Sequence, residues 1–218
     1  MSNDNLYQKS NMNRLGEFSK LSPDAFRAFV NFDQKSLSDG ELSSKLKELI
    51  AVAVAHTTGC PYCIDDHVKQ VKKKEATKEE LAEAIMVATA LKAGSAFAHG
   101  VNALNAYDEI TNEELYKASY FDRLKELSGL NRDVFDAFIS FDQKTMKAGA
   151  LSVKEKELIA IAVAHVTGCP YCINTHVKNA KKARVTKEEM AEAIMVATAL
   201  KAGSALAHGV NALVAYDE

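Results

Sequence analysis

The residues best suited to chemistry are four cysteines, which form two Cys-x-x-Cys pairs: Cys60 with Cys63, and Cys169 with Cys172. A pair at this spacing is typical of reversible disulfide chemistry, because such cysteines often have lowered pKa values and can bond to each other. A structural disulfide framework would disperse its cysteines along the chain. The spacing therefore indicates redox catalysis, with metal binding or simple burial of small side chains as alternatives.

A carboxylate and an imidazole accompany each pair at a fixed spacing. Eleven residues separate Glu48 from Cys60, and three separate Cys63 from His67. Glu157 and His176 flank the second pair in the same way. Lowering a thiol pKa gains little rate by itself, because nucleophilicity falls with basicity. General acid–base catalysis contributes about 10²–10⁴-fold, and these glutamates and histidines are the groups available to supply it.

Proline and glycine signals predict the helix that carries each cysteine pair. In the first copy a helix is predicted over about 61–73, and Pro61 suits the first helical position, which makes Cys60 the expected N-cap. At about 100° per residue, Cys60, Cys63 and His67 fall within an arc of roughly 60°. Their side chains are therefore expected to face one cleft, with helix-terminal N–H groups favouring a thiolate.

Glu48 is expected to reach this cleft from the preceding helix. Ser43 is the candidate N-cap of that helix, which ends at about His56 before a turn at residues 57–59. An antiparallel fold-back through the turn would bring Glu48 towards Cys63 and His67. A carboxylate at the edge of an apolar core can hold a proton for transfer.

The remaining elements also have helical signals. Apolar residues recur at helical spacing over 24–35, and the capping box that begins at Thr77 opens a long helix through Lys92. Gly94 predicts a break, after which Ser95 caps a last helix that ends near Tyr107. Because no alternating strand pattern occurs, the predicted fold class is all-α.

The chain is a tandem duplication with an offset of 109 residues. The stretch AEAIMVATALKAGSA occurs twice, and the four chemical positions repeat at the same offset. We therefore predict two helical domains of the same fold, residues 1–109 and residues 110–218, each with a complete site of its own.

Composition narrows the function classes. The 218 residues are 47% hydrophobic and 26% charged, with a formal net charge of −2. The near-neutral charge argues against a nucleic-acid partner. The polar N-terminus does not resemble a signal peptide, and the uninterrupted apolar runs are too short to span a bilayer, so we expect a cytoplasmic protein without a membrane partner.

The spacing E-x11-C-x2-C-x3-H, found twice, resembles the AhpD-like alkylhydroperoxidase group of the carboxymuconolactone decarboxylase superfamily. The GCPYCI…H context is especially similar to its small peroxidase-like members, including those associated with arsenosugar biosynthesis. The resemblance covers most of each copy. It implies tandem AhpD-like domains and an antioxidant thiol peroxidase that reduces hydroperoxides.

The resemblance also implies a role for each residue. Cys63 and Cys172 would attack the peroxide, Cys60 and Cys169 would resolve the product as a disulfide, and the proton relay would be formed by Glu48, His67, Glu157 and His176. No tightly bound cofactor is implied. A lipoyl or thioredoxin-like dithiol would act as reductant, and the chain would form a homo-oligomer (a dimer, trimer or higher). Tyr62 and Tyr171 depart from the best-known member, which has a second histidine between its cysteines.

Other functions are compatible with parts of the pattern. Zinc could bind two cysteines, a histidine and a glutamate, although three ligands on two helical turns surround a tetrahedral ion poorly. Decarboxylation of a lactone has no evident need for the thiol pair. A disulfide oxidoreductase or redox-sensing module, and a non-enzymatic oligomerisation unit, are further alternatives. His99 and His208 are interpreted as packing residues, and Glu83 and Glu192 as surface or helix-dipole residues.

Overall fold

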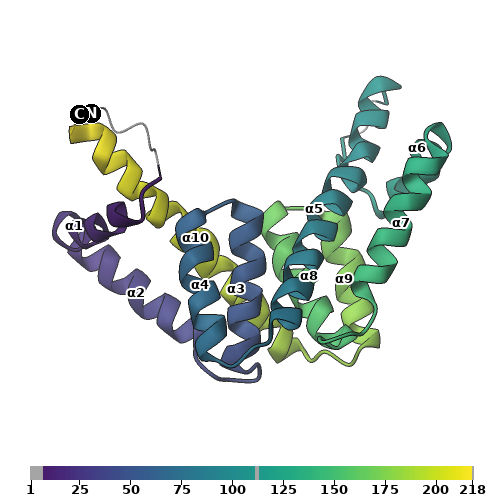
Figure 1. Ribbon diagram of the computed structural model, residues 1–218. Helices are drawn as coiled ribbons and strands as arrows, with labels where there is room; N and C mark the ends of the chain where they lie inside the picture. Colours follow the sequence, from purple (N-terminus) through teal and green to yellow (C-terminus); the bar gives the residue numbers. More distant parts are fainter. Residues whose placement is uncertain (1–6, 111–112, 218) are drawn as a thin grey trace.

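The computed structural model describes residues 7–110 and 113–217, and every regular element within those ranges is a helix (Figure 1). The all-α prediction is confirmed. In chain order the elements are η1 (Lys9–Arg14), α1 (Leu15–Leu21), α2 (Pro23–Leu37), α3 (Ser44–Thr58), α4 (Pro61–Lys73), α5 (Lys78–Tyr107), η2 (Ala118–Arg123), α6 (Leu124–Leu130), α7 (Arg132–Met146), α8 (Val153–Thr167), α9 (Pro170–Lys182) and α10 (Lys187–Asp217).

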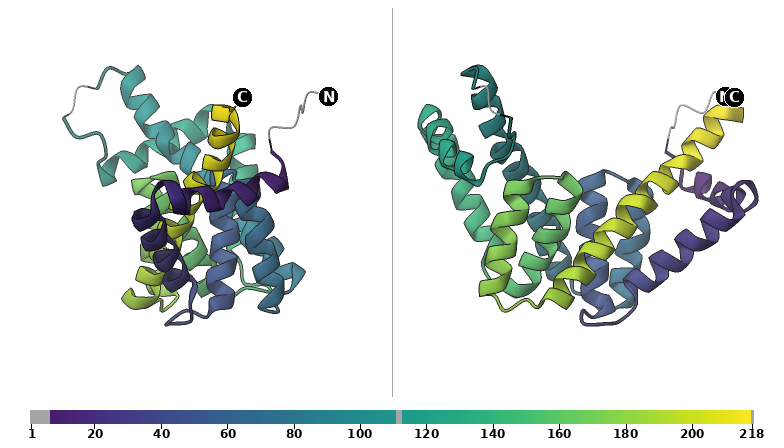
Figure 2. Two further views of the ribbon diagram at one scale, coloured as in Figure 1. Left: turned by 90° about the vertical axis from the view of Figure 1, so that its left-hand side faces the viewer. Right: turned by 180° about the vertical axis from the view of Figure 1, so that it is seen from behind.

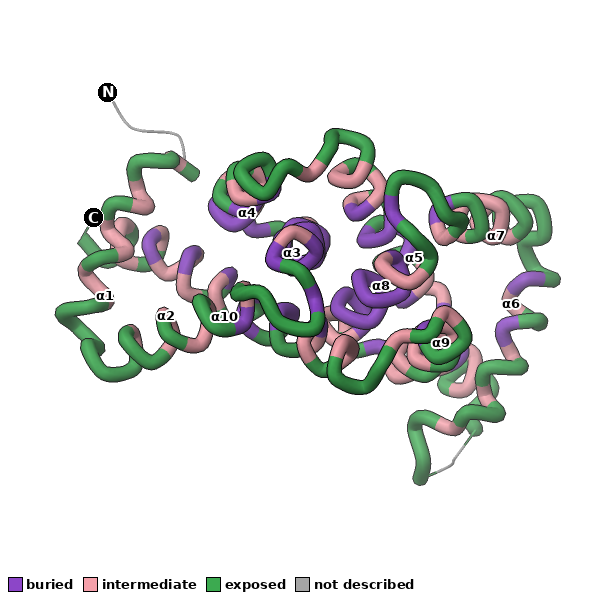
Figure 3. The backbone as a smooth tube through the Cα atoms, turned by 90° about the horizontal axis from the view of Figure 1, so that it is seen from below, coloured by how far each residue is buried: buried purple, intermediate pink, exposed green. Residues whose placement is uncertain are grey.

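Helices α3 and α8 form the centre of a single core. Their apolar runs, residues 49–55 and 158–164, are almost completely buried, and the buried positions gather on these helices in Figure 3. A helix that is apolar on all sides is stable only when other elements surround it. Helices α4, α5, α9 and α10 do so, and one hydrophobic cluster joins residues of both copies.

The N-terminal elements of each copy pack on the last helix of the other copy. Helices α1 and α2 lie against α10, whereas α6 and α7 lie against α5. The ends of α5 and α10 therefore diverge as two arms from the central block, each arm built from both copies (Figures 1 and 2). This exchange was not expected from the duplication.

The break predicted at Gly94 is wrong, because α5 continues from Lys78 to Tyr107 without interruption. Ser95, the expected cap, lies buried inside the helix between buried Leu91 and Ala98. A glycine within a helix costs about 1 kcal/mol relative to alanine. Burial of the flanking side chains against the core outweighs that cost, and α10 continues through Gly203 for the same reason.

The interpretation of Glu83 and Glu192 as surface residues is also wrong. The Glu192 carboxylate accepts hydrogen bonds from the backbone N–H groups of Glu41 (3.0 Å) and Leu42 (2.9 Å) and pairs with buried Lys47 at 2.9 Å. Glu83 makes the equivalent contacts with the loop before α8 and with Lys156. Each glutamate thus fixes the loop that leads into the central helix of the other copy.

Helices α5 and α10 are long and apolar enough to span a membrane by length and composition alone, a property shared by core helices of soluble proteins. In the most apolar 18-residue stretch of each helix, 39% of the residues are buried in α5 and 44% in α10. Both helices pack on α3 and α8, which accounts for part of their apolar character.

Candidate active site

A tight turn between α3 and α4 places the first cysteine pair. Gly59 has a φ of 72°, a left-handed conformation that favours glycine and ends α3. Cys60 then caps α4, and its Sγ accepts a hydrogen bond from the Cys63 N–H group at 3.2 Å. Gly168, Cys169 and Cys172 repeat this geometry at the start of α9. The predicted N-cap role of the first cysteine is confirmed in both copies.

Both cysteine pairs are disulfide-bonded, with Cα–Cα distances of 5.4 Å for Cys60–Cys63 and 5.3 Å for Cys169–Cys172. The two sulfurs of a pair differ in access. Cys60 and Cys169 are 0% exposed, whereas Cys63 and Cys172 are 8% and 7% exposed. The second cysteine of each pair is therefore the one that a small molecule can approach.

The expected fold-back brings the carboxylate and the imidazole together. Glu48 Oε2 on α3 lies 2.8 Å from His67 Nδ1 on α4, and the distance between Glu157 Oε2 and His176 Nδ1 is also 2.8 Å. Glu48 and His67 are both buried. His67 follows Cys63 by one helical turn, so their side chains share a face of α4. With Nδ1 engaged by the carboxylate, Nε2 is the nitrogen left to exchange a proton with that face.

Asp33 on α2 and Asp142 on α7 are site residues that sequence reasoning missed. Burial raises the pKa of each carboxyl above its ordinary value. The nearby Glu48 or Glu157 raises this pKa further, whereas the imidazole of His67 or His176 lowers it. Both aspartates lie in the repeated stretch FDQK. The two copies differ more in this part of the chain, yet both have FDQK. That identity is the signal that could have identified the two aspartates.

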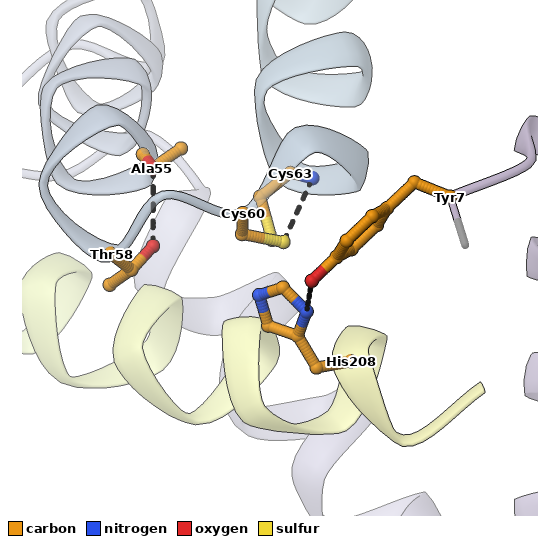
Figure 4. The surroundings of a disulfide bond; sticks show 6 residues. All are labelled: Tyr7, Ala55, Thr58, Cys60, Cys63 and His208. Carbon is orange, nitrogen blue, oxygen red and sulfur yellow. Dashed lines mark hydrogen bonds between the residues drawn. A yellow bond between two sulfur atoms is a disulfide. The ribbon is translucent and has the colours of Figure 1, made fainter. Parts of the chain in front are cut away.

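The packing role expected for His208 and His99 is confirmed by contacts with tyrosine rings, and these contacts lie beside the cysteine pairs. The imidazole of His208, on α10 of the second copy, lies beside the Cys60–Cys63 disulfide of the first copy (Figure 4). The Tyr7 ring packs edge-on against it, with centroids 5.8 Å apart. His99 and Tyr116 repeat this contact at 6.0 Å beside the second site. Each site is therefore composite, which corrects the expectation of a complete site within each copy.

The second cysteine pair borders an apolar cavity of about 530 Å³. Cys172, His176 and Asp142 line it together with the aromatic side chains Phe97, Phe121, Phe135, Phe138 and Tyr171. These walls come from α5, η2, α7 and α9, so elements of both copies enclose the space around the exposed sulfur. The cavity is large enough for a small organic ligand.

Within the part of the chain that the structure describes, no group of three or more His, Cys, Asp and Glu side chains is arranged to hold a metal ion. The four cysteines are instead bonded in pairs.

The fold and the site define an all-helical protein in which two disulfide-forming Cys-x-x-Cys pairs each lie beside a buried Glu–His pair. A sequence model of the carboxymuconolactone decarboxylase family matches the chain twice, over residues 23–106 and 132–215. The chain belongs to this family, in tandem form.

Its curated relatives are about as long as one copy. A protein from Paracoccus denitrificans, called uncharacterized protein 4 in cox locus, is 46% identical over 96 residues, which are 44% of this chain and 86% of the relative. An uncharacterized protein from Haemophilus influenzae is 38% identical over 92 residues, which are 42% of this chain and 81% of the relative.

A solved structure shares the whole fold. It is a chain from Burkholderia xenovorans LB400, provisionally described as a gamma-carboxymuconolactone decarboxylase subunit. The TM-score is 0.68 and the alignment covers 95% of both chains, with 18% sequence identity. At this identity the likeness establishes the fold alone.

Proposed function

We propose that the chain is a thiol-dependent peroxidase with two active sites. The observation that supports this most strongly is the arrangement at each site: a sulfur pair at bonding distance, with its more exposed member one helical turn from an imidazole that a buried carboxylate holds at 2.8 Å. Reversible disulfide formation needs the first feature, and rapid proton transfer needs the second.

In the proposed reaction, the Cys63 thiolate attacks the terminal peroxide oxygen of ROOH. The O–O bond breaks, Cys63 becomes a sulfenic acid, and the leaving alkoxide takes a proton from His67 to give ROH. The Cys60 thiolate then attacks the Cys63 sulfur, which forms the disulfide and expels hydroxide as water after protonation. Overall, two thiols and ROOH give one disulfide, ROH and water. Cys172 and Cys169 act in the same way at the second site.

The division of labour between the cysteines follows from capping and access. The Cys63 N–H group donates to Cys60 Sγ at 3.2 Å, which stabilises a thiolate on Cys60 that is ready to attack the neighbouring sulfur. Cys60 is fully buried and is therefore shielded from the peroxide, whereas Cys63 is not. Helix-end electrostatics thus favour the first cysteine as the resolving thiolate, and the Glu48–His67 pair activates the second.

A dithiol is the reductant that we propose, in the form of a lipoyl group or a thioredoxin-like protein. Its attack on the exposed sulfur of the disulfide would release Cys60 as a capped thiolate, which is a favourable leaving group. The second thiol of the reductant would then resolve the mixed disulfide and restore both cysteines.

The test is peroxide consumption with dihydrolipoamide as the donor. We expect steady turnover by the wild type and none by the double variant Cys63→Ser/Cys172→Ser. Without the donor, the reduced double variant Cys60→Ser/Cys169→Ser should consume one peroxide per site and then stop, because no internal disulfide can form. Turnover that survives loss of both second cysteines would contradict the proposal. Reduction of protein disulfides by a wild type that consumes no peroxide would favour the oxidoreductase alternative.

A further inference from the structure

The surroundings of the two sites differ on the side that faces a substrate. At the second site, the Phe97 ring packs against Phe135 (5.5 Å between centroids) and Phe138 (5.6 Å), and this cluster forms a wall of the cavity beside Cys172. Leu206 replaces Phe97 at the equivalent position of the first site, and Met12 replaces Phe121. The second site thus has an aromatic wall that the first lacks in part.

Charge differs in the same direction. Asp66 stands one residue before His67, and its carboxylate is close enough to raise the pKa of Asp33. The equivalent residue of the second site is the neutral Thr175, which lines the cavity. A further recess at the start of α4, about 510 Å³, is lined by charged side chains, among them Lys9, Asp65 and Lys69. The cavity of the second site also has charged residues in its lining, namely Asp122, Lys125 and Asp142, so the difference in charge is local to the position before the histidine.

A buried hydroxyl at the second site lacks the partner that its counterpart has. Tyr62 OH donates a hydrogen bond to Asn211 Oδ1 at 2.8 Å. Its counterpart, Tyr171 OH, has no hydrogen-bond partner among the described residues, and neither has Oδ1 of Asn102, the counterpart of Asn211. Tyr171 is only 5% exposed and lines the cavity next to Cys172.

The Tyr171 oxygen has almost no accessible surface, so a ligand in the cavity would meet the ring and not the hydroxyl. A cavity walled by aromatic rings beside a reactive sulfur is suited to a molecule with a hydrocarbon body.

We propose that the second site is specialised for bulky apolar hydroperoxides, such as aryl or branched-alkyl hydroperoxides, while the first site serves small ones. This assignment rests on the proposed peroxidase function. The hydrocarbon body occupies the cavity between α5 and α7. Cys172 takes the terminal oxygen, and the oxygen attached to carbon accepts a proton from His176 and departs in the alcohol.

The first experiment compares chains with one working site. Cys63→Ser leaves the second site, and Cys172→Ser leaves the first. The ratio of kcat/KM for cumene hydroperoxide to kcat/KM for hydrogen peroxide should be at least about tenfold higher for the chain that works through the second site, because an apolar pocket discriminates on this scale. Equal ratios in the two active chains would overturn the assignment.

A cavity-filling variant locates the preference. An added Cβ at Gly94 would meet only Phe138, at 3.8 Å, so Gly94→Leu directs its side chain into the cavity without a backbone clash, and it also improves helix propensity. In the chain that works through the second site, it should lower the cumene hydroperoxide rate about tenfold and the hydrogen peroxide rate much less. The matched control, Gly203→Leu at the first site, should change neither. Equal loss of both rates with Gly94→Leu, or a change only in the KM for the dithiol donor, would contradict the assignment.

A binding measurement separates this inference from the peroxidase proposal. The oxidised wild-type chain should bind 2-phenyl-2-propanol, the alcohol product of cumene hydroperoxide, once per chain in a calorimetric titration. Gly94→Leu should abolish binding, and the matched control Gly203→Leu should preserve it. Binding without any peroxide turnover would refute the peroxidase and leave the apolar site standing. Turnover without binding would refute the apolar site and leave the peroxidase.

Discussion

The two cysteine sites of this chain share their reacting groups and differ in their surroundings. The distance between the glutamate and the histidine is 2.8 Å in both, and the first cysteine caps its helix with the same 3.2 Å hydrogen bond. These groups lie on a hairpin of two helices within one copy. The surrounding side chains come from both copies, and they differ in aromatic content, in the charge before the histidine and in hydrogen bonding.

The comparison shows that the cysteine hairpin is kept in both copies while the residues around it differ. The sequence of the hairpin is constrained by its backbone geometry. A glycine in the left-handed conformation, a cysteine that caps the next helix and a proline at its first position must follow one another. Residues on α5, α7 and α10 face the site without taking part in bond making, so they can change in one copy alone. The replacement of Phe97 on α5 by Leu206 on α10 is a change of this kind.

The largest expected effect tests whether the reacting groups are equivalent. In chains with one working site, Glu48→Gln and Glu157→Gln should each lower kcat by about 10²–10⁴-fold, because the imidazole loses the carboxylate that accepts its proton. Stopped-flow peroxide consumption measures both. A large loss at one site and none at the other would show that the shared geometry does not mean shared chemistry.

The contacts between copies are expected to contribute substantially to stability. Glu83→Gln removes the charge opposite buried Lys156 and leaves one acceptor oxygen for two backbone N–H groups, so it should lower the free energy of unfolding by about 3 kcal/mol. Glu192→Gln should cost a similar amount. Urea denaturation measures both, with exposed Glu79→Gln as the control on α5. A loss no larger than that of the control would mean that these carboxylates do not hold the copies together.

The composite sites predict an effect that crosses between copies. His208→Phe should slow disulfide formation at Cys60–Cys63 by about tenfold while Cys169–Cys172 reacts normally, and His99→Phe should do the reverse. The expected loss is smaller than that of the primary relay because each imidazole acts from outside it. Quantitative mass spectrometry of alkylated peptides follows the two disulfides separately. Slowing of the disulfide in the histidine's own copy would contradict the observed exchange of helices.

The smallest expected effect concerns charge near the aspartates. Burial raises the pKa of Asp142 from its ordinary value of 3.8, so its contribution to stability is present below that pH and is lost as pH rises through the folded-state pKa. Thr175→Asp adds the carboxylate that the first site has and should raise this pKa further, whereas Asp66→Thr should lower the pKa of Asp33. Carboxyl titration by NMR measures both shifts. An unchanged Asp142 titration would show that residue 175 does not face it.

The hairpin was predictable because its signals are local. Ser43 marks where α3 begins, Gly59 marks where it ends and Pro61 marks where α4 begins. The resulting fold-back determines where Glu48 lies. The exchange between copies was not predictable, because α5 and α10 are nearly identical in sequence and could pack equally well on either copy. His208 therefore gave no sign that it belongs beside Cys60. The continuity of α5 through Gly94 depends on burial by partners that the sequence does not identify.

The most direct test of the account is to trap the sulfenic acid. One equivalent of hydrogen peroxide per site is added to the reduced double variant Cys60→Ser/Cys169→Ser in the presence of dimedone, and the labelled peptides are identified by mass spectrometry. We predict labels on Cys63 and Cys172, and no label on Cys60 or Cys169 in the reciprocal variant Cys63→Ser/Cys172→Ser. Labels on the first cysteines instead, or on none of the four, would contradict it.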